Sequence, residues 1–262
     1  MISKSCLGIL VVYEPSRAKY ALEKFENFIA RTFKDYSIKV VTNNIEVEGD
    51  VVGSNTCAEF SGWDEGLSGS NYEDYDVIIF ANDTLGSRRP FGLVEKTTFL
   101  NNLSVATKAN RLFLVGGLSW HINYELVARK RKFVLKWVRT DLFALSPVAI
   151  NKINGVSLSE EEISTMVKAD PKGNFIMSQN LPEVVRCRVH DWLDPATPSH
   201  GWHGSAKASK SVKRLKAMCV LQELDLTRRC ISAGVPIYST SKVRKRDYIL
   251  NLLYKIQSCF KS

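Results

Sequence analysis

Two strand-like apolar segments joined by an amphipathic helix open the chain, and this pattern constrains the fold most. Residues 6–13 (CLGILVVY) form a continuous apolar run of strand length, and residues 36–44 (YSIKVVTNN) form a second strand with a polar end. Between them, residues 20–33 place large apolar side chains at helical spacing. This order predicts parallel strands buried on both faces. We therefore expect a Rossmann-like α/β fold, with a mostly parallel central sheet flanked by helices.

Strand and helix patterns continue along the chain. Residues 76–81 (DVIIFA) and 111–118 (RLFLVGGL) predict strands, and residues 136–153 predict a strand followed by a helix that begins near Ser146 and Pro147. Further helices are expected after Ser159 and within residues 211–235, where the helix ends at Gly234. We interpret residues 1–240 as one domain and residues 241–262 as a basic amphipathic C-terminal helix.

Charge and cysteine usage limit the location and the partners. A net charge of +9 favours polyanionic partners, which are nucleic acid, an acidic membrane face or phosphorylated substrates. The six cysteines are scattered without a CxxC pair, as is typical of reduced thiols in a cytoplasm. No stretch approaches the roughly 18 to 20 apolar residues of a spanning helix. We expect a cytoplasmic protein, soluble or peripherally bound to a membrane.

Polar side chains stand at the ends of three consecutive predicted strands. They are Glu14, Asn43, Asn44, Asn82 and Asp83. Ligands of open α/β sheets bind at the carboxyl ends of the strands. Because the chain has no glycine-rich phosphate loop, these residues suggest a nucleotide held by side chains together with a metal. Asn and Asp also end strands and start turns, and for each single residue that alternative is equally open.

Three segments, in order, resemble motifs of the inverting nucleotide-sugar glycosyltransferases of the GT-A fold that build bacterial polysaccharides. The segments WDEGL and YDVIIFANDT resemble a helix end and a D-x-D-like strand tip of that family. The resemblance implies that Asp83 binds a divalent cation, Mn²⁺ or Mg²⁺, which bridges the two donor phosphates. Asn82 stands where a further acid is common. The segment RTDLFALSPVAI is similar to the acceptor-side floor and implies acceptor contacts for Arg139 and Asp141.

The third segment, QELDLTRRCISAG, resembles the element that carries the catalytic base of this family. Glu223 occupies the position of the base, Asp225 that of the following acid and Arg229 that of the arginine, while Gln222 replaces the first acid. Inverting transfer needs a base for the acceptor hydroxyl and a cation for the departing diphosphate. The alternative is an ordinary charged helix face with an i,i+4 pair from Asp225 to Arg229.

The resemblance implies a complete set of site residues. It divides the domain into a donor-binding half over residues 1–105 and an acceptor-binding half over residues 106–240, and the catalytic candidates are Glu223 and Asp225. The candidates for donor binding are Glu14, Asn43, Asn44, Asp64, Asn82 and Arg229. Those for acceptor binding are Trp137, Arg139, Asp141, His190 and Asp191. Asp83 and His203 are the metal candidates, although histidines in a loop such as HGWH are more often plain surface.

These observations predict an inverting glycosyltransferase that moves a sugar, most simply from a UDP-sugar, to a lipid-linked bacterial glycan in surface polysaccharide biosynthesis. The tail, with basic residues 242–246 before an apolar helical face, suits docking on the anionic inner face of the cell membrane. A terminal helix packed on the domain is an equal alternative. A basic nucleic-acid-binding α/β module, suggested by KASKSVKRLK and KVRKR, ranks below. So does a nucleotidyltransferase of related fold.

Overall fold

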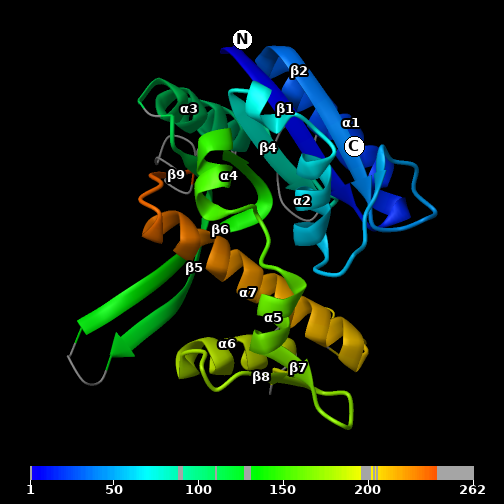
Figure 1. Ribbon diagram of the computed structural model, residues 1–262, viewed down its shortest axis with the longest axis vertical. Helices are drawn as coiled ribbons and strands as arrows, with labels where there is room; N and C mark the ends of the chain where they lie inside the picture. Colours follow the sequence, from blue (N-terminus) through cyan, green and yellow to red (C-terminus); the bar gives the residue numbers. More distant parts are fainter. Residues whose placement is uncertain are drawn as a thin grey trace, which may run out of the picture.

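The computed structural model describes residues 2–87, 91–109, 111–126, 131–195, 202, 204 and 206–240, with the side chains of residues 2, 3 and 119–136 left aside. A seven-stranded sheet forms its centre (Figure 1). Its strand order is β3-β2-β1-β4-β6-β5-β9. The strands are β1 (Ile2–Val12), β2 (Phe33–Thr42), β3 (Val51–Val52), β4 (Val77–Asn82), β5 (Leu114–Leu126), β6 (Arg131–Leu145) and β9 (Ile237–Ser239).

One strand breaks an otherwise parallel arrangement. β1 pairs in parallel with β2 and β4, β2 with β3, and β5 with β9, while β6 runs antiparallel to both of its neighbours, β4 and β5. The predicted mostly parallel α/β sheet is thereby confirmed. Buried parallel strands need apolar side chains on both faces, and the run CLGILVVY supplies them.

Helices cover both faces of the sheet. α1 (Pro15–Thr32) and α3 (Leu93–Ala109) pack on one face, where they meet Cys6, Leu10 and Val12 of β1. α2 (Glu59–Ser68), α4 (Pro147–Ile153) and α7 (Lys210–Ser232) pack on the other, where they meet Leu7, Ile9 and Val11. Alternate residues of one strand therefore enter two separate cores, as the period of two requires.

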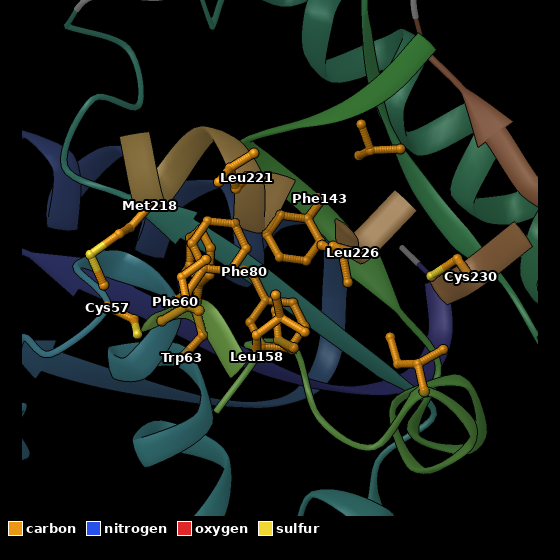
Figure 2. Packing of buried hydrophobic residues seen from close by; sticks show 14 of the residues in the cluster. Cys57, Phe60, Trp63, Phe80, Phe143, Leu158, Met218, Leu221, Leu226 and Cys230 are labelled. Carbon is orange, nitrogen blue, oxygen red and sulfur yellow. The ribbon is translucent and has the colours of Figure 1, made fainter. Parts of the chain in front are cut away.

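A tryptophan-centred cluster holds α2 against the middle of the sheet (Figure 2). Trp63 is fully buried, with Phe60, Phe80 and Phe143 edge-to-face around it at centroid distances of 5.0 to 6.1 Å. Its Nε1 donates to the backbone oxygen of Ala81 at 3.0 Å, which satisfies the buried indole. Trp63 is thus a core residue.

A small lobe lies beside α7, away from the sheet (Figure 1). It contains α5 (Glu160–Met166), the strand pair β7 (Val167–Ala169) and β8 (Phe175–Met177), and α6 (Glu183–Leu193). Ser159 caps α5 through a reciprocal capping box with Glu162, and Ser146 caps α4, so both predicted helix starts are confirmed. The short 3-10 helix η1 (Tyr72–Asp74) precedes β4.

Strands β5 and β6 are longer than the sequence predicts. They pair as far as Leu126 and Arg131 and project from the body as a two-stranded ribbon (Figure 1). Antiparallel partners joined by a short connection can extend their ladder without neighbours in the sheet, which local apolar runs do not reveal. α7 ends at Ser232, and Gly234 follows with φ of +66°, close to the predicted end. The predicted tail helix, 241–262, lies outside the described residues.

Close packing of α2 on β1 gives a test of the fold. A Cβ on Gly66 would lie 2.7 Å from Cγ2 of Ile9, whereas the nearest atom to one on Gly69 would be Nζ of Lys39, the far end of a long side chain, 3.1 Å away. We expect Gly66→Ala to lower the free energy of unfolding in urea by about 1–3 kcal/mol, because α2 must move off the sheet. Gly69→Ala is the matched control, and an equal effect of both changes would contradict this packing.

Candidate functional site

The sheet has a switch point between β1 and β4. The chain passes from β1 to β2 and β3 on one side and then to β4 on the other, so the connections leave β1 in opposite directions. Ligands of open α/β sheets bind outside the carboxyl ends of the strands at such a point. Tyr13 and Glu14 follow β1 there, and Asn82 and Asp83 end β4.

The carboxylate of Asp83 ties these two strand ends together. Its Oδ2 accepts hydrogen bonds from the backbone N–H groups of Tyr13 at 3.0 Å and Glu14 at 2.7 Å. Its Oδ1 lies 3.5 Å from the guanidinium of Arg17, in the first turn of α1. A buried carboxylate is stable here because two amides and a cation replace water. Asn82 forms a local turn, accepting from the backbone N–H of Thr84 at 3.1 Å.

The groups around Asp83 show whether this carboxylate could bind the predicted divalent cation. Oδ2 is occupied by amides, and Arg17 stands beside Oδ1 and also 3.6 Å from Oε2 of Glu14. A hard divalent cation binds where several oxygen ligands converge and where no other positive charge competes for them. In the described part of the chain, no group of three His, Cys, Asp or Glu residues converges as a metal site. This donor set does not fit the ion, and the other metal candidate, His203, lies outside the described residues.

The two asparagines after β2 point to different neighbours. Asn44 donates from Nδ2 to the backbone oxygen of Tyr13 at 3.0 Å, which joins the ends of β2 and β1. Asn43 donates to the backbone oxygen of Ala58 at 2.9 Å, just before α2. Within the described residues, the buried Oδ1 of Asn43 has no hydrogen-bond partner. Glu14, Asn44, Asn82 and Asp83 thus gather at one sheet edge, with Asn43 beside them facing α2.

Glu223, in the middle of α7, is held by two donors from β6. Oε1 accepts from Oγ1 of Thr140 at 2.5 Å, and Oε2 accepts from Nε1 of Trp137 at 3.2 Å. Burial raises the pKa of Glu223 to about 7, the Thr140 hydrogen bond opposes this rise, and the charges of Glu59 and Asp141 add to it. Near neutral pH the carboxyl therefore exchanges a proton readily, as a general base must.

The strand register brings Glu223 and Asp83 to the same edge of the sheet. The ladder between β4 and β6 ends at the pair Ala81 and Leu142. Residues 137–141 of β6 therefore continue past the carboxyl end of β4, where Asp83 lies. Alternation along β4 sends Phe80 to the face of α7 and Ala81 to the face of α1. Asp83 accordingly sits on the α1 side of this edge and Glu223 on the α7 side.

Further charged groups surround Glu223. Asp141 pairs with Nε of Arg139 at 3.2 Å, and the Arg139 guanidinium lies over Gly117, where a Cβ would be 2.8 Å away. Cys219 donates from Sγ to Oε2 of Glu59 at 3.7 Å, while burial, and Glu59 after it, keeps the pKa of this thiol well above its usual range. The predicted acceptor residues Trp137, Arg139 and Asp141 thus gather with Glu223. Glu59 and Arg17 were missed, since neither belongs to a motif.

Three other predicted site residues hold a loop. Asp64 accepts from the backbone N–H groups of Val156 and Ser157, both at 2.8 Å. Arg229 donates to the backbone oxygens of residues 153, 155 and 156 at 2.7 to 2.8 Å. Asp225 holds Arg229 at 2.7 Å and Arg228 at 2.6 Å. Asp64 and Arg229 thus bond directly to residues 153–157, Asp225 holds Arg229, and the i,i+4 pair of Asp225 and Arg229 is present.

The remaining candidates lie in the small lobe. His190 and Asp191 are exposed on α6, and the ring of His190 lies 5.6 Å from that of Phe175. No described contact joins either residue to Glu223 or Asp83. His190 and Asp191 are therefore not brought to the sheet edge by any interaction that the structure describes.

Comparison of the chain with protein-family models, with curated proteins and with solved structures finds no match. The class that the geometry itself defines is an open, mostly parallel α/β protein with polar side chains at a switch point and, on α7, a glutamate whose pKa burial raises to about 7.

The loop-fixing role of Asp64 can be tested directly. Asp64→Ala leaves two backbone N–H groups without an acceptor, so we expect the free energy of unfolding to fall by about 1–3 kcal/mol. Asp74→Ala, at an exposed position of η1, is the control. If Asp64→Ala leaves the stability in urea unchanged but abolishes nucleotide binding, Asp64 is a donor-binding residue and does not fix the loop.

Proposed function

We propose that this protein is an inverting glycosyltransferase of the GT-A type, in which Glu223 removes the proton from an acceptor hydroxyl. The observation that carries the proposal is the environment of Glu223, whose pKa is raised to about 7 between two fixed donors. Perturbed carboxyls of this kind cluster at catalytic sites. The motif order in the sequence supports the same assignment.

The proposed reaction is one displacement at the anomeric carbon. The acceptor oxygen passes its proton to Glu223 as it bonds to the anomeric carbon, and the bond from that carbon to the diphosphate oxygen breaks. The nucleoside diphosphate leaves with the electron pair, and Glu223 later releases the proton to solvent. Thr140 and Trp137 each take one lone pair, so each carboxylate oxygen keeps another for the incoming proton. Their fixed donors hold the carboxylate in one orientation.

The donor would lie at the switch point. Glu14 and Asn44 stand near the nucleoside end in this arrangement, whereas the Oδ1 of Asn43 is buried beside Gly53 and Gly62 and is not assigned to the donor. Arg17 lies 3.5 Å from Asp83 and would stabilise the departing diphosphate. No step is assigned to a divalent cation, because Arg17 already faces Asp83.

The acceptor and the location follow from the resemblance. A UDP-sugar donor, a lipid-linked glycan acceptor and a place on the inner membrane surface are the finer parts of the proposal. The described helices include none that is long and apolar enough to cross a bilayer. The acceptor side would be lined by Trp137, Arg139 and Asp141, whose planar and charged groups suit a sugar ring with hydroxyls.

Replacement of Glu223 tests the proposal. We expect Glu223→Gln to keep the thermal shift that UDP produces, with or without Mn²⁺, but to reduce nucleoside diphosphate release by roughly 10²-fold or more. Because the folded protein favours the protonated carboxyl, protonation contributes to the free energy of unfolding. This contribution is complete below the ordinary pKa of 4.5 and is lost as pH rises through about 7. Glu223→Gln should therefore be at least as stable as the wild type at pH 8.

The control for this experiment is Glu161→Gln, at an exposed position in the first turn of α5. Turnover by Glu223→Gln near the wild-type rate would remove Glu223 from the mechanism. A thermal shift with oligonucleotides and with none of the nucleoside diphosphates would instead favour a nucleic-acid-binding module.

The pH profile gives an independent test. The rate should rise with pH through about 7 as Glu223 loses its proton. Thr140→Val removes the hydrogen bond that favours the ionised form of Glu223, so the pKa of Glu223 should rise further. The rising limb of the pH–rate profile should then shift to higher pH by about one unit. Thr97→Val, exposed on α3, is the matched control. A limb that stays in place in Thr140→Val would contradict the role of Thr140.

A further inference from the structure

Three cations gather on the outer surface of α1 and α3, on the sheet face opposite Glu223. This cationic cluster consists of Lys24 and Arg31 of α1 and Lys96 of α3. The Nζ of Lys24 lies 5.1 Å from the ring centroid of Tyr20, and the Nζ of Lys96 lies 5.1 Å from that of Phe91. The two helices are joined beneath the cluster, where Phe91 and Phe99 pack edge-on against Phe28. The cluster therefore lies next to the packed rings of Phe28, Phe91 and Phe99.

The cluster is electrostatically unsatisfied. Among the ion pairs of the described residues, none joins Lys24, Arg31 or Lys96 to a carboxylate. Burial lowers the pKa of Lys96, and the charges of Lys24 and Arg31 lower it further. Three like charges that lie together with no ion pair among the described residues lower the stability of the fold. Conflicts of this kind are expected at functional surfaces, where a ligand resolves them.

Exposed apolar side chains border the cluster. Leu93 is 68% exposed, one turn before Lys96 on α3, and Tyr20 is 44% exposed, one turn before Lys24 on α1. Phosphate groups satisfy the cations, but a sugar-phosphate backbone offers Leu93 no apolar environment. The boundary between head groups and acyl chains offers both, since cations bind lipid phosphates while leucine and tyrosine enter the boundary.

We propose that this surface docks on an anionic membrane, with the cationic cluster on the lipid phosphates and Leu93 and Tyr20 at the acyl boundary. The inference stands apart from glycosyl transfer, because it uses no residue of the proposed active site. It also assigns membrane contact to the folded domain, independently of the basic residues 242–246. The ligand class is the phosphate head group of an anionic lipid bilayer.

The test compares charge-neutralised variants of the full chain. Co-sedimentation would use vesicles of phosphatidylcholine alone and of phosphatidylcholine mixed equally with phosphatidylglycerol. We expect the wild type to bind the mixed vesicles, and Lys24→Gln/Lys96→Gln to bind them roughly 30-fold more weakly, since each cation near the surface contributes about a fivefold effect. Leu93→Ser should weaken binding severalfold, because the apolar contact is lost.

Lys152→Gln/Lys168→Gln is the matched control, since it removes the same charge from exposed positions on α4 and β7. Both double variants keep the tail. Unchanged binding by the cluster variant, or an equal loss in the control, would overturn the proposal. Cluster-dependent binding to duplex DNA without vesicle binding would overturn it in favour of nucleic acid. Neutralising unpaired like charges should leave the cluster variant at least as stable as the wild type in urea, so unfolding cannot mimic the expected loss.

Discussion

The antiparallel insertion of β6 between β4 and β5 is the constraint on which the rest of the structure depends. Its ladder with β4 fixes the central aromatic pair of Phe80 and Phe143, stacked at 4.8 Å. Because β6 runs against β4, its residues 137–141 continue beyond the carboxyl end of β4. There Trp137 and Thr140 meet Glu223 of α7. If this strand were parallel to β4, its C-terminal end, and not residues 137–141, would lie beyond the carboxyl end of β4.

Most of the polar side chains predicted as site residues hold the backbone in place. Asp83 satisfies two amides between β1 and α1, and Asp64, Asp225 and Arg229 fix the loop after α4. Glu223 differs from them, because its two hydrogen-bond donors, Trp137 and Thr140, are neutral, and burial and the charges of Glu59 and Asp141 raise its pKa. The pKa of Glu223 is raised to about 7, so this carboxyl can exchange a proton near neutral pH. This contrast, rather than residue type, separates the candidate base from the structural acids.

Sequence reasoning succeeded where contacts are local. The Ser146 and Ser159 caps were predicted because a cap bonds to an amide three residues away. The pair of Asp225 and Arg229 was foreseen for the same reason. Glu59 and Arg17 were missed, since Glu59 meets Cys219 of α7 from 160 residues away along the chain, and Arg17, after β1, meets Asp83 at the end of the neighbouring strand β4. Asp64 was predicted as a donor ligand because a sequence does not show that a distant loop presents amides to it.

The amino-acid sequence by itself determined the α/β alternation, the buried parallel strands and the polar residues that follow them. These features depend on hydrophobic periodicity and on short-range capping, which act within a few residues. Only the tertiary structure decided which carboxylates are paired, which residues surround Glu223 and where Lys24, Arg31 and Lys96 come together. Desolvation and charge coupling are properties of the surroundings in space, so the same glutamate or lysine carries no such property until the chain has folded around it.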